Sequence, residues 1–499
     1  MKIFYCVPVI ICLSILSCEN QKNKEERLAR QYCGSCHAFP NPSLLDKKTW
    51  ADKVMPEMAF RMGLDNSALN TISFEDQSAI LRSLPTHAMI SNENWEIIKR
   101  YYSENAPDSL INPEQVIGDT LKQFTAFPVH LKMSYNQTVT VIKHDSATRR
   151  ILVGNRPGKL YELNVQFKVM DSLPLLSAPS KLTLQENGNL EILLMGIMDP
   201  NEQPKGSIKK LDHRDRKITQ LLDSLQRPVD FVSADLDNNG TTDYVVCNFG
   251  NYTGSLMAFQ SGADGKFNKY VLQHLPGARR VILKDIDGNG TIDILALMAQ
   301  GDERIIAFYN QGNFQFRMST LLRFQSVYGS SYFEIADFND DGKFDILHTS
   351  GDNADYSPVL KPYHGLRIFL NSGSNDFKEH WFYPMHGASQ ARVNDFDGDG
   401  DPDIAAISFF PDFKKHPEHG FIYLENTSQG FVPQITPLAR KGRWITMEMS
   451  DIDGDGDSDV VLGSLAFPTQ IPADLLTEWG SEKYDLLFLR NTLNDSISK

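Results

Sequence analysis

The chain has 499 residues, too many for one ordinary hydrophobic core, so two or more domains are expected. Its hydrophobic share of 41% and charged share of 22% are typical of soluble globular proteins. The formal net charge of -14 argues against nucleic acid as a partner, because phosphate binding needs a dense basic surface that no segment supplies.

Residues 1–17 have the pattern of an export signal, because an apolar run too short for a comfortable membrane span follows Lys2. A small residue precedes Cys18, and this pair resembles the cleavage box of bacterial lipoproteins. The resemblance implies a lipidated Cys18 that anchors the protein to the outer membrane of the cell envelope, on its periplasmic or exposed side. A plain secretory signal is the alternative. Residues 18–30 are then a polar, flexible tether.

Three cysteines remain after this cleavage besides Cys18, namely Cys33, Cys36 and Cys247. An exported protein of this size with no expected disulfide pair must use Cys33 and Cys36 for another purpose. Cys247 lies in the strand-like run Tyr244–Cys247, where a buried structural thiol is expected.

Residues 33–37 read Cys33-Gly34-Ser35-Cys36-His37, which is the attachment sequence for c-type haem. The two thiols form thioether bonds to the vinyl groups, and His37 ligates the iron. A zinc half-site would need a second Cys or Cys/His pair nearby, and none follows. A thioredoxin-like redox pair would need a βαβ context that the flanks do not offer. The sequence therefore predicts one covalent haem c.

Three helices are expected after this motif, each with a polar start and a proline at its end. They are expected between Ser43 and Pro56, between Ser73 and Pro85, and between Ser91 and Pro107. We therefore expect a small α-helical cytochrome c domain over residues 31–106, followed by a linker over residues 107–123.

The sixth ligand of the haem iron has several candidates. A methionine thioether is the usual choice in an electron carrier, because it raises the reduction potential. Trp50 followed by Pro56-Glu57-Met58 resembles exported mono-haem cytochrome domains of Bacteroidota and related bacteria, and this resemblance favours Met58. The methionines near it also have the spacing of an apolar helix face. The alternatives to Met58 are Met55, Met62, His87 and Met89.

From residue 124 onward the sequence repeats itself, and five segments share the pattern Asp-x-Asp/Asn-x-Asp/Asn-Gly-x-x-Asp. Oxygens at every second residue can converge on one cation, and Ca²⁺ takes roughly six to eight oxygens. About five Ca²⁺ ions are therefore predicted. The predicted ligands are Asp235, Asp237, Asn239, Thr241 and Asp243; Asp285, Asp287, Asn289, Thr291 and Asp293; Asp337, Asn339, Asp341, Lys343 and Asp345; Asp395, Asp397, Asp399, Asp401 and Asp403; and Asp451, Asp453, Asp455, Asp457 and Asp459.

Short β-type runs flank these loops, and the Glu at position twelve of an EF-hand is missing. An apolar-aromatic strand recurs seven times, and each repeat is long enough for four strands. The first two repeats have lost the acidic ladder, although Gln185–Asn189 keeps the turn. The fold is therefore expected to be mainly β, with a seven-bladed β-propeller over residues 124–492. The strand near Phe124 to Val129 is expected to complete the last blade.

These repeats resemble the FG-GAP (VCBS-type) family, which forms the blades of integrin α-subunit propellers and of many bacterial surface proteins. The resemblance covers roughly residues 124–492 and implies a seven-bladed propeller with calcium loops on one face. Strands alternate in direction, so the loops between second and third strands lie on the other face. Three of these are long, over residues 350–364, 408–419 and 464–483.

Long loops on a rigid face are where ligands usually bind. Arginines near aromatic residues suit an anionic or hydroxyl-rich ligand such as an acidic glycan or a sugar acid. Pairing of these arginines with neighbouring aspartates is the alternative. The candidate ligand-face residues are Arg227, Arg279, Tyr356, His364, His386 and Arg443.

Two functions fit these features. In the first, the haem passes single electrons between a redox partner and the propeller's substrate or another membrane carrier. Its enzymatic form would be a haem-linked oxidoreductase, which quinone-dependent propeller dehydrogenases resemble in outline, but no catalytic motif or quinone site is evident. In the second, the protein is a cell-surface binding or adhesion module with an accessory haem domain.

Overall fold

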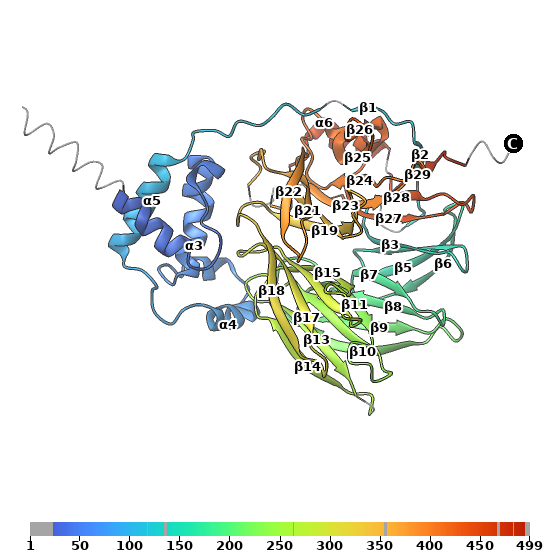
Figure 1. The fold of residues 1–499 in the computed structure, drawn as a ribbon, viewed down its shortest axis with the longest axis horizontal. Coiled ribbons are helices and arrows are strands. Elements are labelled where there is room, and N and C mark those ends of the chain that lie inside the picture. Colours follow the sequence, from blue (N-terminus) through green and yellow to red (C-terminus); the bar gives the residue numbers. More distant parts are fainter. Residues whose placement is uncertain are drawn as a thin grey trace, which may run out of the picture. The chain divides into compact units, whose positions relative to one another are not determined.

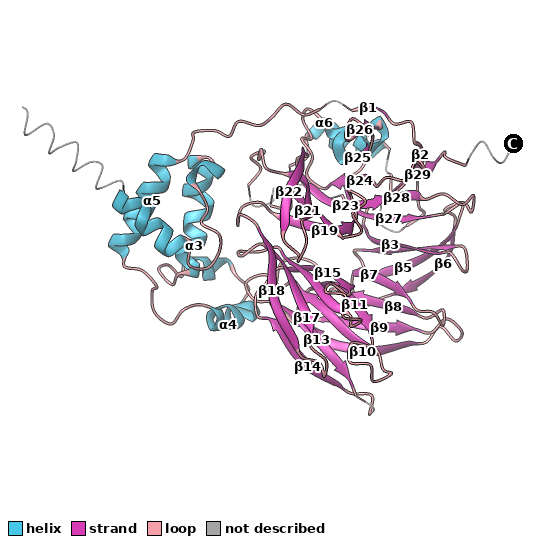
Figure 2. Cartoon of the chain, viewed as in Figure 1, coloured by secondary structure: helices cyan, strands magenta, loops and turns pink. Residues whose placement is uncertain are grey.

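The computed structural model describes residues 23–494 apart from 117, 134–136, 263, 354–356, 467–469 and 483. This part of the chain forms two compact units. The helical unit extends to Ile111 and includes Gln325–Val327, and the β unit comprises Asn112–Phe324 and the residues from Tyr328 onward. Helices make up the first and strands most of the second (Figure 2). Within these residues no helix has the length and apolar character needed to cross a membrane. The predicted signal, the lipidated Cys18 and Tyr356 lie outside the described residues.

The helical unit starts with a helix over residues 23–33, which runs into the cysteine motif, so the predicted tether over residues 18–30 is helical from residue 23 onward. Ser73 and Ser91 accept hydrogen bonds from backbone N–H groups three residues on and cap the last two helices, as expected from their sequence. The elements after the first helix are η1 (Pro42–Leu44), α2 (Lys47–Thr49), η2 (Trp50–Val54), α3 (Met55–Arg61), η3 (Ser67–Thr71), α4 (Phe74–Ser83) and α5 (Asn92–Asn105) (Figure 1).

The helix that was expected to end at Pro56 continues to Arg61, so this prediction is wrong. Its start also differs, because Asp46 is the cap and accepts a hydrogen bond from the Thr49 N–H at 3.0 Å. Pro56 is tolerated because η2 is a π-helical turn, which widens the helix just before a residue that lacks an N–H and whose ring needs space. The methionines on either side of Pro56 therefore share one continuous helical segment.

The β unit consists of seven antiparallel sheets of four main strands, so the predicted seven-bladed propeller is confirmed. The first strands of neighbouring blades contact one another and line the centre. Blades one to three are β3 (Val139–Asp145), β4 (Arg150–Asn155), β5 (Lys159–Asn164) and β6 (Val169–Pro174); β7 (Pro179–Leu184), β8 (Leu190–Leu194), β9 (Gly206–Leu211) and β10 (Ile218–Leu225); and β11 (Pro228–Ala234), β12 (Asp243–Asn248), β13 (Ser255–Ser261) and β14 (Phe267–Gln273).

The remaining blades follow the same order along the chain (Figure 1). Blades four and five are β15 (Ala278–Lys284), β16 (Asp293–Met298), β17 (Arg304–Asn310) and β18 (Phe316–Arg323); and β19 (Ser330–Ala336), β20 (Asp345–Ser350), β21 (Gly365–Asn371) and β22 (Phe377–Pro384). Blades six and seven contain β23 (Ala388–Asn394), β24 (Asp403–Ser408), β25 (Phe421–Glu425) and β26 (Val432–Ile435); and β27 (Trp444–Ser450), β28 (Asp459–Ser464) and β29 (Leu486–Asn491). The connections near them carry η4 (Pro417–Gly420), η5 (Pro437–Lys441) and α6 (Ala473–Ser481).

The last blade is closed by β2 (Phe124–Val129), which pairs with β29 from Phe124 opposite Asn491 to Val129 opposite Leu486. This confirms the predicted closure, which joins the two ends of the ring and leaves no unpaired edge between them. The predicted linker differs in its second half. Residues of β1 (Asp119–Thr120) pair in parallel with β26 and add a fifth strand to blade six.

The second strand of each blade with an acidic loop is buried at every residue, because it packs against neighbouring blades on both faces. Cys247, on β12, is fully buried as expected, and burial raises the pKa of its thiol well above the usual range. Between the innermost strands, ion pairs join neighbouring blades. These pairs are Lys143 with Glu448, Lys181 with Asp230, and Arg280 and Arg392 with Glu334.

Candidate haem and cation sites

The cysteine motif lies at the end of the helix over residues 23–33, where the Gly34 N–H donates to the Arg30 carbonyl at 3.1 Å. A Cβ on Gly34 would lie 2.6 Å from that carbonyl oxygen, so glycine is the residue that fits. Cys33 is partly buried and Cys36 is exposed, and both are free thiols. Burial raises the pKa of Cys33 to about 11, which keeps this thiol protonated and uncharged. Neither thiol is used in a disulfide, so both are available for thioether bonds.

The ring of His37 is oriented by a hydrogen bond of 2.9 Å from Nδ1 to the Ala38 carbonyl. A ring nitrogen that donates to a backbone carbonyl leaves Nε2 as the basic nitrogen, which is the usual arrangement of a metal-ligating histidine. The following segment is anchored to the core. Tyr102 Oη donates to the Pro40 carbonyl and Trp50 Nε1 to the Pro42 carbonyl, each at 2.8 Å.

Apolar side chains around the motif are only partly buried, although they pack against the core of the helical unit. A flat apolar macrocycle would cover such side chains, so the residues present fit a haem. Met58 and Met62 belong to this set, whereas Met55 is buried in the core and Met89 is exposed. The partly buried residues of the helical unit are Leu28, Tyr32, Cys33, Phe39, Val54, Met58, Met62 and Leu64.

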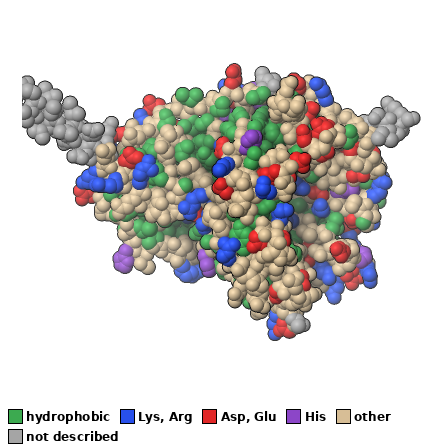
Figure 3. Space-filling view, in the orientation of Figure 1, with side chains coloured by type: hydrophobic (Ala, Val, Ile, Leu, Met, Phe, Trp, Pro, Cys, Tyr) green, Lys and Arg blue, Asp and Glu red, His purple; other side chains and the backbone are tan. Residues whose placement is uncertain are grey.

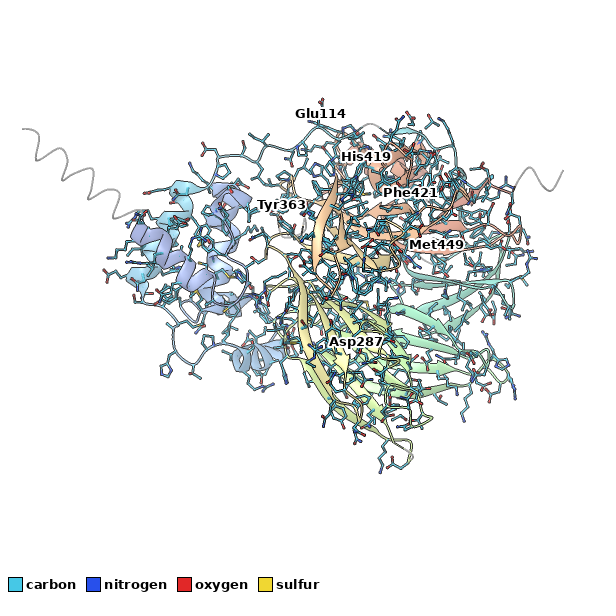
Figure 4. The ribbon with its side chains drawn as sticks, viewed as in Figure 1. Glu114, Asp287, Tyr363, His419, Phe421 and Met449 are labelled. Carbon is cyan, nitrogen blue, oxygen red and sulfur yellow. The ribbon has the colours of Figure 1, made fainter. Side chains whose placement is uncertain are left out.

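The five acidic loops each connect the first and second strands of blades three to seven. In four of them, three carboxylates offer oxygens within 4.8 Å of one another, and Asp287 of one such group is labelled in Figure 4. The fifth loop differs, because Lys343 forms an ion pair with Asp341 and takes up one of its carboxylates. The groups are Asp235, Asp237 and Asp243; Asp285, Asp287 and Asp293; Asp395, Asp397 and Asp399; and Asp451, Asp453 and Asp459.

The electrostatics of these loops favour a cation. Burial and then the charges of nearby loop aspartates raise the pKa of Asp459 to about 7 and that of Asp403 to about 6. Carboxylates whose charged forms are disfavoured in this way are stabilised when a divalent ion lies between them. The glycine of the loop allows the sharp turn that brings the carboxylates together. Gly290 has a φ of +84° and open space around its Cβ position, so backbone conformation, and not crowding, is the reason for glycine there.

The aspartate at position nine of each loop has a second role that the pattern did not predict. Asp243 is fully buried, and its two oxygens accept the backbone N–H groups of Leu236 and Ser261 at 2.9 and 2.8 Å. The same pair of bonds ties the loop to the end of the third strand in the other four loops. We call these two bonds to the residue at position nine the clamp. In blade two, Asn189 accepts the His213 N–H at 3.1 Å, so part of the clamp remains where the alternating aspartates are lost.

The fifth loop allows the clamp to be tested with little contribution from a carboxylate cluster. We expect Asp345→Ala to lower the free energy of unfolding by about 2–6 kcal/mol, because one buried and one partly buried N–H group lose their acceptor at about 1–3 kcal/mol each. Asp341→Ala, on the exposed side of the same loop, is the matched control and should cost under about 1 kcal/mol. Urea unfolding in the presence of a chelator, so that no bound cation contributes at either residue, measures both values. Equal losses would contradict the clamp.

Three of the predicted ligand-face residues are buried, whereas all six were expected on an accessible face. Arg443, His364 and His386 are only 1%, 2% and 4% exposed. The Arg443 guanidinium lies 4.0 and 4.5 Å from the ring centres of Phe409 and Phe410 and donates from Nε to the Phe409 carbonyl. These three side chains are therefore buried within the layer of loops.

The other two described candidates are less buried. Arg227 donates to the carbonyls of Met198 and Gly250, and Arg279 lies 3.7 Å from Asp352. The pairing of arginine with aspartate that was left open as an alternative is thus present at Arg279. Figure 3 shows Lys and Arg side chains interspersed with Asp and Glu on the face in view.

Two of the long loops pack together on this face. Phe413, from the loop over residues 408–419, forms a small apolar cluster with Leu475 and Trp479 of α6. The rings of Phe413 and Trp479 lie edge to face at 6.0 Å, and Trp479 Nε1 donates to the Arg440 carbonyl at 2.7 Å. The loop layer is therefore held by its own core as well as by the blades beneath it.

A family model matches one repeat of this chain, and several solved structures show a distant likeness to it. Residues 285–348 match the family model of the FG-GAP-like repeat. Among solved structures, the N-terminal domain of Nup159 is similar at 9% identity, with 76% of this chain and 98% of that chain covered and a TM-score of 0.44. The Dos1 propeller is similar at 8% identity, with 72% and 80% covered and a TM-score of 0.44. The Neurospora crassa Pan2 WD40 domain has 11% identity, 76% and 97% coverage and the same TM-score. A search of curated protein sequences gave no match.

Proposed function

We propose that the protein is an exported c-type cytochrome, anchored to the outer membrane by a lipid on Cys18, whose haem carries single electrons. The observation that carries the proposal is the Cys33-Gly34-Ser35-Cys36-His37 motif at a helix end, with both thiols free and His37 Nδ1 bonded to a carbonyl. When bound, haem supplies one-electron exchange. Cys33 and Cys36 attach it, His37 ligates it through Nε2, and the partly buried apolar residues exclude water from its faces.

In this proposal the calcium-loaded propeller binds the redox partner or a substrate, for which a glycan or sugar acid is the leading class. Support comes from the long loops opposite the acidic loops, two of which pack together through the Phe413 cluster, and from Arg443, which lies between phenylalanines. A rigid loop layer binds with a lower entropic cost than mobile loops. The same feature favours a second candidate, a cell-surface binding or adhesion module with an accessory haem domain.

Haem reduction kinetics separate these candidates. The full-length haem-loaded protein is mixed with sugars and sugar acids and followed at the haem absorption bands. The oxidoreductase form predicts that one class reduces the haem, whereas the adhesion module predicts binding without reduction. A potentiometric titration tests the electron-carrier function in both cases. It should give one reversible one-electron transition, and a protein without such a transition is not an electron carrier.

Met58 is expected to be the sixth ligand. Met58→Ala should remove the weak near-infrared charge-transfer band of a methionine-ligated ferric haem. Met58→His should lower the reduction potential on the order of 100 mV, within the ~0.8 V range that axial ligands set. Met62→Ala is the matched control, because both methionines are partly buried against the same core. A band that persists in Met58→Ala and vanishes in Met62→Ala would assign Met62 instead.

A further inference from the structure

A group of metal-ligating side chains lies outside the calcium loops, in the connection between β24 and β25. His416, Glu418 and His419 each offer a ligand atom, and these atoms lie within 4.8 Å of one another. His416 Nδ1 is 3.3 Å from Glu418 Oε1, and the two imidazole rings stack with centres 4.9 Å apart at 16°. Figure 4 labels His419 on this connection. The short turn η4 therefore brings two imidazoles and one carboxylate to one point.

The ring of His419 is oriented from outside this turn. Its Nδ1 lies 2.9 Å from Gln115 Oε1, an acceptor, so Nδ1 carries the proton and Nε2 has the free lone pair. Gln115 comes from the segment before β1, close to the labelled Glu114 in Figure 4. A neutral imidazole held by a second residue through its other nitrogen is the form that ligates metals.

A third histidine lies beside this group. His386, between β22 and β23, is buried, and its Nδ1 has no hydrogen-bond partner among the described residues. Its backbone is bonded to the end of β24, where the connection that carries the group begins, because Ser408 Oγ donates to the His386 carbonyl at 2.6 Å. Its ring also forms a hydrogen bond with the Lys361 backbone. Such a bond through one ring nitrogen orients an imidazole whose other nitrogen binds a metal. A buried nitrogen without a partner is costly, and a bound metal ion would satisfy it.

We propose that His416, Glu418 and His419, with His386 as a further donor, form a binding site for one transition-metal ion of the Zn²⁺ class. Imidazole nitrogens with one carboxylate suit borderline cations such as Zn²⁺, whereas Ca²⁺ requires oxygen ligands. The site would be chemically distinct from the calcium loops and independent of the haem. It lies on the face of the propeller opposite the calcium loops, so the metal would stabilise the loop layer there.

Zinc binding to the full-length haem-loaded protein tests the proposal. The protein is stripped with chelator, its free thiols are alkylated, and excess Ca²⁺ is added to fill the acidic loops. Zn²⁺ is then titrated in competition with a chromogenic chelator. We expect one equivalent to bind with micromolar or tighter affinity. His416→Gln and His419→Gln should each weaken it by more than about 100-fold, and Gln115→Ala, which removes only the orienting contact, by about 10–100-fold.

The matched control is His380→Gln, which removes an exposed histidine on β22 and should leave zinc affinity unchanged. Melting temperatures in Ca²⁺ without Zn²⁺ identify any variant that has lost its fold, and the graded Gln115→Ala variant keeps all the proposed ligands. The proposal is overturned if the wild-type protein binds no zinc in excess Ca²⁺, if folded His416→Gln and His419→Gln keep full affinity, or if His380→Gln loses it.

Discussion

Removal of Ca²⁺ with a chelator is expected to lower the melting temperature of the propeller by about 10–15 °C. Four loops bring three carboxylates each within 4.8 Å, and burial already disfavours the charged form of Asp459. A free ion concentration of roughly 100 times the Kd stabilises the folded protein by about 2.7 kcal/mol per site. Four such sites in a domain of this size correspond to a change in melting temperature of about 10–15 °C. Scanning calorimetry with and without chelator measures it.

Re-addition of a divalent cation and substitutions in the loops are the controls for this prediction. Ca²⁺ should restore the melting temperature much better than Mg²⁺, whose octahedral demand suits these loops poorly. Asp399→Ala and Asp455→Ala should destabilise the Ca²⁺-loaded protein more than Asn187→Ala, because Asn187 lies in a turn without the acidic ladder. A protein that melts identically with and without chelator would refute cation binding, and equal sensitivity at Asn187 would mean that blade two binds metal as well.

Loss of covalent haem is the second large effect that we expect. Cys36→Ala or His37→Ala, expressed with a haem-ligation system, should remove nearly all c-type absorption from the purified protein. Cys36 is exposed, so its replacement leaves no cavity that would unfold the helical unit. His37→Ala removes the nitrogen that its bond to the Ala38 carbonyl leaves free for the iron. Pyridine-haemochrome spectra, normalised to protein, measure the outcome.

Ser35→Ala is the matched control for these variants. Ser35 lies inside the motif and is exposed, and its hydroxyl donates to the Tyr32 carbonyl at 2.8 Å, a bond worth about 1 kcal/mol. This variant should keep its haem. If Cys36→Ala gives the same spectrum as the wild-type protein, this thiol is not needed for attachment.

The propeller could be predicted because its repeats carry their geometry locally. Each acidic loop combines aspartates at alternate positions with a glycine of positive φ, and a strand must follow such a turn. Counting these units gave seven blades, and the strand at Phe124 to Val129 followed from the missing outer strand of the last unit. The starts of α4 and α5 were predictable for a similar reason, since a serine cap acts within three residues.

Other features depend on contacts that no local pattern records. Pro56 was expected to end a helix, but a π-helical turn precedes it and the helix continues, with Trp50 and Met55 buried in the core. Arg443 looked like a ligand contact, yet it lies among phenylalanines from the adjacent loop. The contact of Gln115 with His419 joins residues 304 positions apart, and only the folded chain brings them together.

The central claim, that Cys33 and Cys36 hold a covalent haem, is tested most directly by the intact mass of the full-length protein. The protein is expressed with a haem-ligation system, denatured and measured by mass spectrometry, so that any non-covalent group is lost. Our account predicts a mass equal to the processed polypeptide plus one haem, with the added mass on the peptide that contains Cys33 to His37. A mass equal to the polypeptide alone would contradict it.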